Sequence, residues 1–159
     1  MEKFVVLLRH GIAHPPDTEP DETRELTDEG HRRMKQIARG LRRILPHVNA
    51  IISSPLTRAL QTATWVGKSL DLGVTTDDAL RPSADTRAIR TLLTSTSAET
   101  VILVGHEPTL TAAMLDLTRM DAESSLELKK GGCYAVRFTG GEVGQLEWML
   151  APRVLRRLD

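Results

Sequence analysis

The sequence lacks several features that would mark a particular class of protein. It has one cysteine, Cys133, so no disulfide can form within the chain and no cysteine cluster can bind a metal. The longest uninterrupted apolar run is five residues, far short of the roughly 20 that a membrane-spanning helix requires. Lysine plus arginine and aspartate plus glutamate both number 21, so no net charge favours binding to nucleic acid or to a membrane surface.

The remaining composition is that of an ordinary globular protein. The 159 residues are 40% hydrophobic and 26% charged, which suits one core and a single domain spanning residues 1–159. The first predicted strand begins directly after Met1-Glu2-Lys3, which leaves no room for a signal peptide. We therefore expect a monomeric, cytoplasmic protein.

Short apolar runs alternate with amphipathic stretches along the chain. Strands are predicted at residues 4–8, 48–52, 74–76, 101–104, 133–138 and 145–150. Helices are predicted between the first five strands, because apolar residues there recur at helical spacing. Three helix starts are marked, by Thr27 as an N-cap, by Ser54 before Pro55, and by Pro108.

The predicted order of elements is β-α-β-α-β-α-β-α-β-β. Strands that alternate with helices favour an α/β fold, a three-layer sandwich with helices on both faces of a central sheet. The final hairpin adds antiparallel pairing, so we expect a mostly parallel, mixed sheet of about six strands. A basic, amphipathic tail over residues 152–159 is expected to be a packed or frayed end.

Basic and imidazole side chains follow three of the predicted strands. Arg9 and His10 follow the first strand, Arg58 lies in the first turn of the helix after the second, and His106 follows the strand at 101–104. Taken alone, Arg9 and His10 are equally compatible with the polar end of a strand. Because the carboxyl ends of parallel strands meet at one edge of a sheet, all four side chains are expected to converge there.

Such a set of residues suits a phosphoryl group. Helix N-termini offer free N–H groups, and guanidinium groups match the geometry of phosphate oxygens. An imidazole among guanidinium groups is expected to stay neutral, and a neutral imidazole is a competent nucleophile toward phosphorus. Its other ring nitrogen then requires an acceptor, for which a backbone carbonyl of the adjacent turn is suitable.

Other phosphatase chemistries and metal sites fit the sequence poorly. A cysteine phosphatase requires Cys-x5-Arg, but Thr139 stands six residues after Cys133, and no Asp-x-Asp follows a predicted strand. The pair His10 and His14 has the spacing of two ligands on a helix, but the glycine between them and the prolines after them argue against a helix there. No metal and no other cofactor is expected.

Three blocks of sequence resemble the signature motifs of the histidine phosphatase, or phosphoglycerate-mutase-like, superfamily. They are Arg9-His10-Gly11, Ser53-Ser54-Pro55-Leu56-x-Arg58-Ala59-x-Gln61-Thr62-Ala63 and Gly105-His106. The resemblance extends from about Phe4 to the last predicted strand. The short chain and the run Arg24-x-Leu26-Thr27-x2-Gly30 are most similar to the SixA-type phosphohistidine phosphatases.

The resemblance implies a role for each residue of the predicted site. His10 would be the nucleophile and would carry the phosphoryl group until water hydrolyses it. Arg9, Arg58 and His106 would bind the phosphoryl oxygens, and Arg24 matches a position near the phosphate. The implied fold is phosphoglycerate mutase-like, and the implied enzyme needs no metal.

The proton donor departs from the family pattern. Relatives that act on esters usually have a carboxylate that protonates the leaving alkoxide. Segment 80–85 contains no matching glutamate, and Glu107 stands where one branch of the family has aspartate. Glu107 is therefore either a general acid or a residue that binds backbone N–H groups at the start of a helix. Because imidazole leaves more readily than an alkoxide, a missing acid fits a phosphohistidine substrate.

The predicted substrate follows from the absence of a long insertion. Larger members of the superfamily use such insertions to cap the pocket around a small molecule, whereas an open site admits a phosphorylated side chain of a protein, such as a histidine-phosphotransfer domain. The sequence thus predicts a phosphohistidine phosphatase. The alternatives are a phosphomonoesterase that acts on a small phosphorylated molecule with Glu107 as general acid, and a non-catalytic domain that binds phosphorylated ligands.

Overall fold

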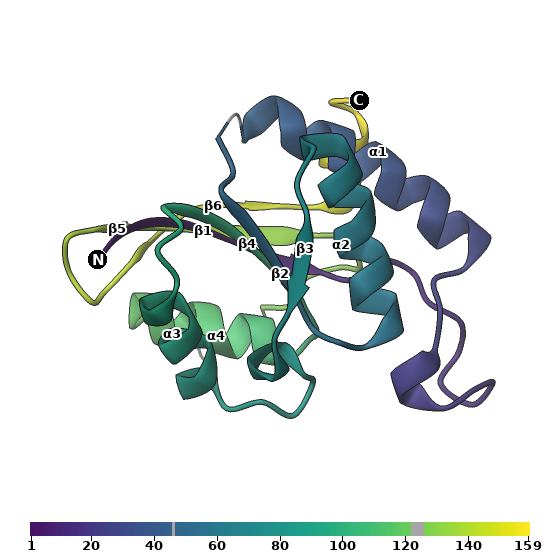
Figure 1. Ribbon diagram of the computed structural model, residues 1–159, viewed down its shortest axis with the longest axis horizontal. Coiled ribbons are helices and arrows are strands. Elements are labelled where there is room, and N and C mark those ends of the chain that lie inside the picture. Colours follow the sequence, from purple (N-terminus) through teal and green to yellow (C-terminus); the bar gives the residue numbers. More distant parts are fainter. Residues whose placement is uncertain (46, 122–125) are drawn as a thin grey trace.

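The computed structural model describes residues 1–45, 47–121 and 126–159. Within these ranges it contains a sheet of six strands in the order β3-β2-β4-β1-β5-β6 (Figure 1). The strands are β1 (Glu2–Arg9), β2 (Ala50–Ser53), β3 (Val74–Thr76), β4 (Thr100–Gly105), β5 (Cys133–Thr139) and β6 (Gln145–Leu150).

Helices separate the first five strands, as the sequence predicts. They are α1 (Asp28–Ile44), α2 (Thr57–Leu70), α3 (Thr86–Ser95) and α4 (Thr109–Thr118), with the short α5 (Pro152–Arg156) after β6 and the 3-10 turns η1 (Asp21–Thr23) and η2 (Asp78–Leu80). None of the helices in the described ranges is both long and apolar enough to cross a bilayer.

The strand pairing confirms a mixed sheet. Strands β3, β2, β4 and β1 are parallel neighbours, and β5 and β6 join the edge beyond β1 in antiparallel pairs. Each parallel connection contains a helix, because a chain that returns to start a parallel strand must cross the full length of the sheet. The carboxyl ends of β1, β2 and β4 therefore lie side by side at one edge.

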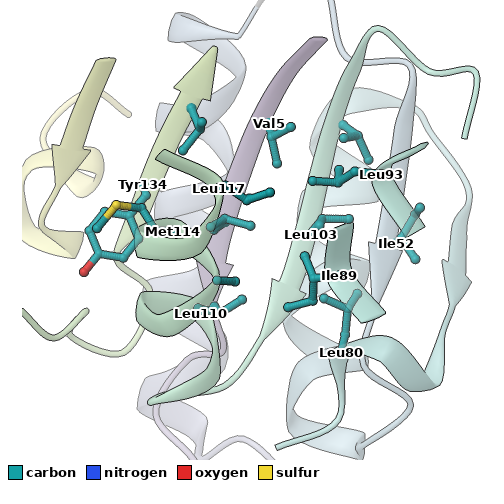
Figure 2. Packing of buried hydrophobic residues seen from close by; sticks show 14 of the residues in the cluster. Val5, Ile52, Leu80, Ile89, Leu93, Leu103, Leu110, Met114, Leu117 and Tyr134 are labelled. Atoms are coloured by element: carbon teal, nitrogen blue, oxygen red, sulfur yellow. The ribbon is translucent and has the colours of Figure 1, made fainter. Parts of the chain in front are cut away.

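Each face of the sheet packs against its own layer of helices, which confirms the three-layer sandwich. Alternate residues of a strand point to opposite faces. Val5 and Leu7 face the layer of α3 and α4, whose packing Figure 2 shows, while Val6 and Leu8 face α1, α2 and α5. All four are fully buried, and burial of each such side chain contributes about 1.5–3 kcal/mol.

The start of α1 is tied to the segment that follows β1. Thr27 is the N-cap and accepts a hydrogen bond from the N–H of Gly30 at 2.9 Å, as predicted. A Cβ at Gly30 would lie 2.1 Å from the carbonyl oxygen of Ile12, so only glycine permits this close approach. The contact fixes the chain shortly after His10.

The start of α2 differs from the prediction. The helix begins at Thr57 with Leu56 as its N-cap, two residues later than a helix that has Pro55 as its first residue. The hydroxyl of Ser54 does accept a hydrogen bond from the N–H of Leu56 at 3.3 Å, but it is also bonded to His106 at the sheet edge. The loop thus reaches across to β4 before the helix starts.

Candidate active site

The carboxyl edge of the sheet brings the four predicted residues together. The ring centroids of His10 and His106 are 5.2 Å apart, and Nε of Arg58 lies 3.4 Å from Nε2 of His10. These three residues line one hollow with Arg9, and its volume is about 490 Å³. The hollow therefore combines residues from the junctions after β1, β2 and β4.

The backbone determines the tautomer of His10. Nδ1 of His10 lies 2.7 Å from the carbonyl oxygen of Gly11, and because a carbonyl can only accept, Nδ1 must carry the proton. Nε2 then holds the ring's free electron pair, and it faces Arg58 in the hollow. The predicted backbone acceptor is thus the carbonyl of Gly11. Because it holds the proton on Nδ1, Nε2 of His10 is the nucleophilic ring nitrogen.

Both histidines are held neutral, although the main cause differs from the one that the sequence suggests. Burial lowers the pKa of His10 from 6.5 to about 3, and the positive charges of Arg58 and Arg9 contribute less. Burial is also the largest cause that lowers the pKa of His106 to about 3, followed by the charge of Arg58. Removal of the rings from water therefore matters more than the neighbouring cations.

His106 has one ring nitrogen free for a ligand. Its Nε2 lies 2.8 Å from the hydroxyl of Ser54, whereas its Nδ1 is buried and has no partner among the residues that the structure describes. The Ser54 oxygen already accepts the N–H of Leu56, so its own proton is available to Nε2. When Nε2 accepts that proton, the ring proton of His106 lies on Nδ1, where it can donate to an anion.

Arg9 is held by a segment far along the chain. Its Nη1 donates to the carbonyl of Leu128 and lies 3.3 Å from the carboxylate of Glu127. Its Nε is buried without a partner in the described part of the chain. The guanidinium is therefore oriented on one side and retains hydrogen-bonding capacity on the other.

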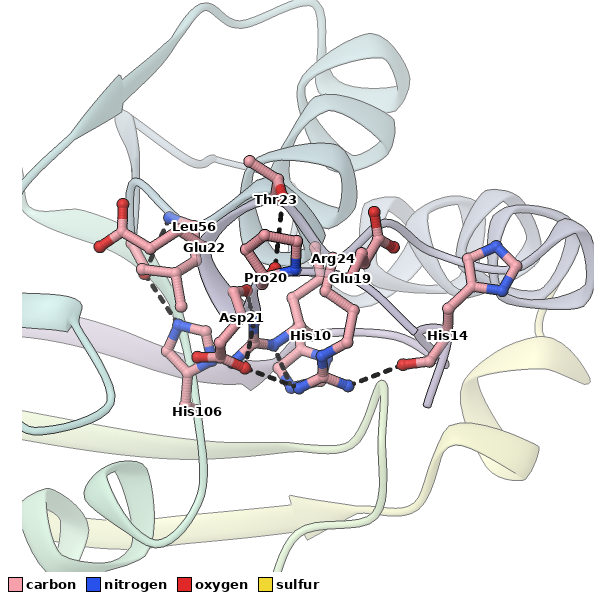
Figure 3. Close-up of polar contacts among 12 residues, drawn as sticks. His10, His14, Glu19, Pro20, Asp21, Glu22, Thr23, Arg24, Leu56 and His106 are labelled. Carbon is pink, nitrogen blue, oxygen red and sulfur yellow. Dashed lines mark hydrogen bonds and ion pairs between the residues drawn. The ribbon is translucent and has the colours of Figure 1, made fainter. Parts of the chain in front are cut away.

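Asp21 joins the two remaining arginines of the site (Figure 3). Its carboxylate lies 3.1 Å from Nη2 of Arg24 and 3.3 Å from Nη1 of Arg58, and its backbone carbonyl accepts from Arg58 at 2.8 Å. Although burial opposes it, the hydrogen bond from Arg24 and the charge of Arg58 keep the pKa of Asp21 below its ordinary value. An ionised carboxylate thus pairs with the guanidinium groups of two arginines that line the hollow.

Glu107 lines the same hollow, but both of its oxygens are engaged by the protein. Oε1 accepts the N–H of Thr111 at 2.9 Å. Oε2 accepts the hydroxyl of Thr111 at 2.5 Å and the N–H of Leu128 at 3.1 Å. One of these contacts is to a backbone N–H of α4. This arrangement corresponds to the interpretation in which Glu107 binds backbone N–H groups at the start of a helix.

The sequence analysis assigns no role to several residues that shape the site. Asp21 precedes Arg24 by three positions, and this spacing of opposite charges is the available signal for it. Thr62 belongs to the second motif block, and its hydroxyl accepts the N–H of Gly11 at 3.0 Å. Lys130 lines the hollow and carries no recognisable signal, because its place depends on the fold of a loop.

The other histidines lie outside the catalytic arrangement. His14 is exposed at the rim of the hollow, where its carbonyl accepts from Arg24 at 2.9 Å. His31 accepts the indole N–H of Trp65 at 3.0 Å, and His47 is exposed. Over residues 1–45, 47–121 and 126–159, no group of three or more His, Cys, Asp or Glu side chains is placed to hold a metal ion.

Comparison with known sequences identifies related proteins. The model of the histidine phosphatase superfamily (branch 1) matches residues 5–82, which include two of the three motif blocks. An uncharacterised protein of Picosynechococcus sp. strain PCC 7002 is 33% identical over 135 residues, which are 81% of this chain and 81% of that protein.

Comparison with solved structures shows the same fold. The protein histidine phosphatase SixA, solved in complex with tungstate, has a TM-score of 0.84 at 24% identity and covers 96% of this chain and 99% of its own. A mutant of the phosphoserine phosphatase of Entamoeba histolytica, solved with phosphoserine, has a TM-score of 0.78 at 16% identity and covers 95% of this chain and 98% of its own. The mixed sheet of this chain is therefore the phosphoglycerate mutase-like sheet of these structures.

Proposed function

The chain belongs to the histidine phosphatase superfamily and is a phosphatase, and from that premise we propose that it hydrolyses phosphohistidine carried on another protein. The proposed substrate is a phosphorelay protein of the histidine-phosphotransfer type. The proposed intermediate is a phosphohistidine at His10. Arg9, Arg58 and His106 bind the phosphoryl oxygens in this proposal, and Arg24 lies beside them at the rim.

The observation that carries the proposal is the orientation of His10. With the proton held on Nδ1 by the carbonyl of Gly11, Nε2 carries the electron pair, which accepts a hydrogen bond of 3.4 Å from Nε of Arg58 and which an incoming phosphoryl group would take in its place. A phosphoryl group there lies among Arg9, Arg58 and the free Nδ1 of His106, all of which can donate to its oxygens. Such donors stabilise the negative charge on the equatorial oxygens of the transferring group.

The proposed reaction has two displacements at phosphorus. In the first, Nε2 of His10 forms a bond to phosphorus while the N–P bond of the substrate breaks, and the departing imidazole keeps the electron pair and takes up a proton. In the second, water forms the new O–P bond, the bond to Nε2 breaks, and phosphate is released. No step requires a metal or an external electron carrier.

The environment of Glu107 supports phosphohistidine over an ester. An alkoxide needs a proton as it leaves, and a general acid must present an O–H to it. Both oxygens of Glu107 instead accept hydrogen bonds from Thr111 and Leu128. An imidazole departs with less assistance, so this site suits a phosphoramidate better than an alkyl phosphate.

A small-molecule phosphomonoesterase is the second candidate. The similarity in fold to a phosphoserine phosphatase favours it, as does the hollow of about 490 Å³, which lies within the ~300–1,000 Å³ typical of small-ligand pockets. In that case Glu107, which lines the hollow, is the available carboxylate.

A substrate panel tests the proposal and separates the two candidates. The purified protein is incubated with a phosphorylated histidine-phosphotransfer protein, phosphoserine, and common sugar and nucleotide phosphates, and phosphate release is measured for each. We expect the highest kcat/KM on the phosphohistidine protein. A preference for an alkyl phosphate would contradict the proposal and support the esterase, and binding of vanadate without turnover of any substrate would indicate a non-catalytic domain.

A further inference from the structure

The backbone of Leu128 connects two parts of the site that are far apart in sequence. Its N–H donates to Oε2 of Glu107 at 3.1 Å, and its carbonyl accepts from Nη1 of Arg9. The side chain of Leu128 is fully buried in the core under α3 and α4. Because the two groups are joined by the Cα of Leu128, a displacement of its backbone moves the acceptor on which the guanidinium of Arg9 rests.

Glu107 is itself fixed by buried groups behind it. The hydroxyl of Thr111 donates its one proton to Oε2 of Glu107, so its contact of 2.9 Å with Tyr134 requires the tyrosine hydroxyl to be the donor. Thr111 and Tyr134 are both buried, and they belong to α4 and β5. One chain of hydrogen bonds thus runs from the core through Glu107 and Leu128 to Arg9.

The alternative support for Arg9 is weak by comparison. The other acceptor near Nη1 is the carboxylate of Glu127 at 3.3 Å, and the side chain of Glu127 is 70% exposed. Exposed ion pairs contribute little to the placement of a side chain, because water competes for both partners. The carbonyl of Leu128 is therefore the main determinant of the orientation of the Arg9 guanidinium.

We propose that Glu107 is a positioning residue: it fixes the backbone N–H of Leu128, and the carbonyl of that same residue holds Arg9 in place for an oxyanion in the hollow. The inference rests on the proposed function in one respect, the role of Arg9 as a phosphoryl-binding residue. The positioning role of the Glu107 carboxylate requires no proton transfer. Glu107 acts on oxyanion binding through Arg9, and it acts equally on every substrate.

Affinity for inorganic orthovanadate tests this role without a substrate. In Glu107→Gln an amide –NH2 replaces one acceptor oxygen, so either the N–H of Thr111 or that of Leu128 loses its partner. Loss of the negative charge of Glu107 by itself favours an anion in the hollow, so a rise in the Kd for vanadate requires that Arg9 be displaced. We expect a net rise of about threefold, because the roughly tenfold loss for one hydrogen bond to a charged group is partly offset by the removed charge. Asp116→Asn, which removes a carboxylate of α4 that pairs with Arg90, is the control and should leave the Kd unchanged.

A double-mutant cycle shows whether the effect passes through Arg9. Arg9→Ala alone weakens vanadate binding, and addition of Glu107→Gln to Arg9→Ala should then have little further effect, because the group that Glu107 positions is gone. Thr111→Val provides a second variant that leaves the carboxylate intact but removes one of its donors. We expect it to raise the Kd for vanadate about threefold, and it carries the test if Glu107→Gln does not fold.

The outcomes separate this inference from the proposed function. Unchanged vanadate affinity in both Glu107→Gln and Thr111→Val, or additive losses in the cycle with Arg9→Ala, would overturn the positioning role. A rate loss in Glu107→Gln that grows with the basicity of the leaving group would also overturn it, since that pattern identifies a general acid. If vanadate binding depends on Glu107 as expected but no phosphohistidine protein is hydrolysed, the proposed substrate is wrong and the positioning role stands.

Discussion

The floor of the hollow and its rim are built in different ways. His10, Arg58 and His106 form the floor, each lies within a few residues of the end of a buried strand, and their exposed fractions are 6%, 4% and 2%. The rim comes from the loop residues Arg24 and Lys130. The side chain of Arg24 is 11% exposed and is held by Asp21, whose own side chain is 58% exposed.

This difference implies that the floor carries out the reaction and that the rim contributes to binding. Side chains at strand ends are held by the packing of the whole sheet, so their geometry is preorganised for chemistry. Side chains on the rim are held by polar contacts that compete with water, so they are easier to displace and to change. Substitutions in the floor should therefore remove the reaction, and substitutions in the rim should adjust binding.

The largest effect is expected at His10. His10→Asn retains a polar side chain but removes the nucleophile, and loss of such a group costs a rate factor of at least about 10³. The measurement is phosphate release from the phosphohistidine protein under single-turnover conditions. His47→Asn, at an exposed position outside the hollow, is the control and should retain full activity. Substantial activity in His10→Asn would contradict the mechanism.

A direct comparison of the floor with the rim is possible at two arginines. Arg58→Ala removes a buried guanidinium beside Nε2 of His10 and should reduce kcat about 10²- to 10³-fold. Arg24→Ala removes a guanidinium that donates to the His14 carbonyl and to Asp21, and it should raise KM about tenfold with a smaller change in kcat. Equal losses of kcat in the two variants would show that the rim takes part in the chemistry.

Acid should destabilise the folded protein because the ring of His10 is buried in its neutral form. The folded state keeps His10 neutral down to a pKa of about 3, whereas the unfolded chain takes up a proton near the ordinary value of 6.5. The free energy of unfolding is therefore unaffected by protonation of His10 above pH 6.5, and it decreases progressively as the pH falls from 6.5 toward 3. Between pH 7 and pH 5 the loss is about 2 kcal/mol for one such histidine.

Urea unfolding of wild type and His10→Asn at the two pH values measures this contribution. The decrease in the free energy of unfolding from pH 7 to pH 5 should be about 2 kcal/mol smaller in His10→Asn. An equal decrease in both proteins would mean that the ring of His10 takes up protons freely in the folded state.

The smallest effect is expected at Asp21 on the rim. Asp21→Asn keeps the backbone carbonyl that binds Arg58 but removes a negative charge that is paired with Arg58, which lines the hollow. Exposed ion pairs contribute up to about 1 kcal/mol, so we expect the Kd for inorganic phosphate to fall about two- to fivefold. Isothermal titration gives the Kd, and a rise would instead show that the carboxylate holds Arg58 in its binding position.

The sequence predicts the floor well for a physical reason. Short apolar runs identify the buried strands, and parallel pairing places the residues after them at a common edge, which is how Arg9, His10, Arg58 and His106 come to line one hollow. The N-cap at Thr27 is likewise a local signal and is present in the structure. These features depend on residues close together in the chain.

The features that the sequence does not predict depend on contacts between residues that are distant in the chain. Arg9 and Leu128 are 119 positions apart, and no local pattern indicates that one accepts a hydrogen bond from the other. The start of α2 was predicted too early because Ser54 bonds to His106, 52 positions away, in addition to the helix start. The neutrality of the histidines was predicted from nearby charge, whereas burial, which requires the fold, is its main cause.

The most direct test of the central claim is to trap the intermediate. Wild-type protein is mixed with a histidine-phosphotransfer protein that carries radiolabelled phosphoryl groups, denatured in alkali within milliseconds to seconds, and digested for peptide mapping. The account predicts an acid-labile, alkali-stable label on the peptide that contains His10, formed and lost at rates that match turnover. Full turnover with no label on His10 at any time, or with the label on another residue, would contradict it.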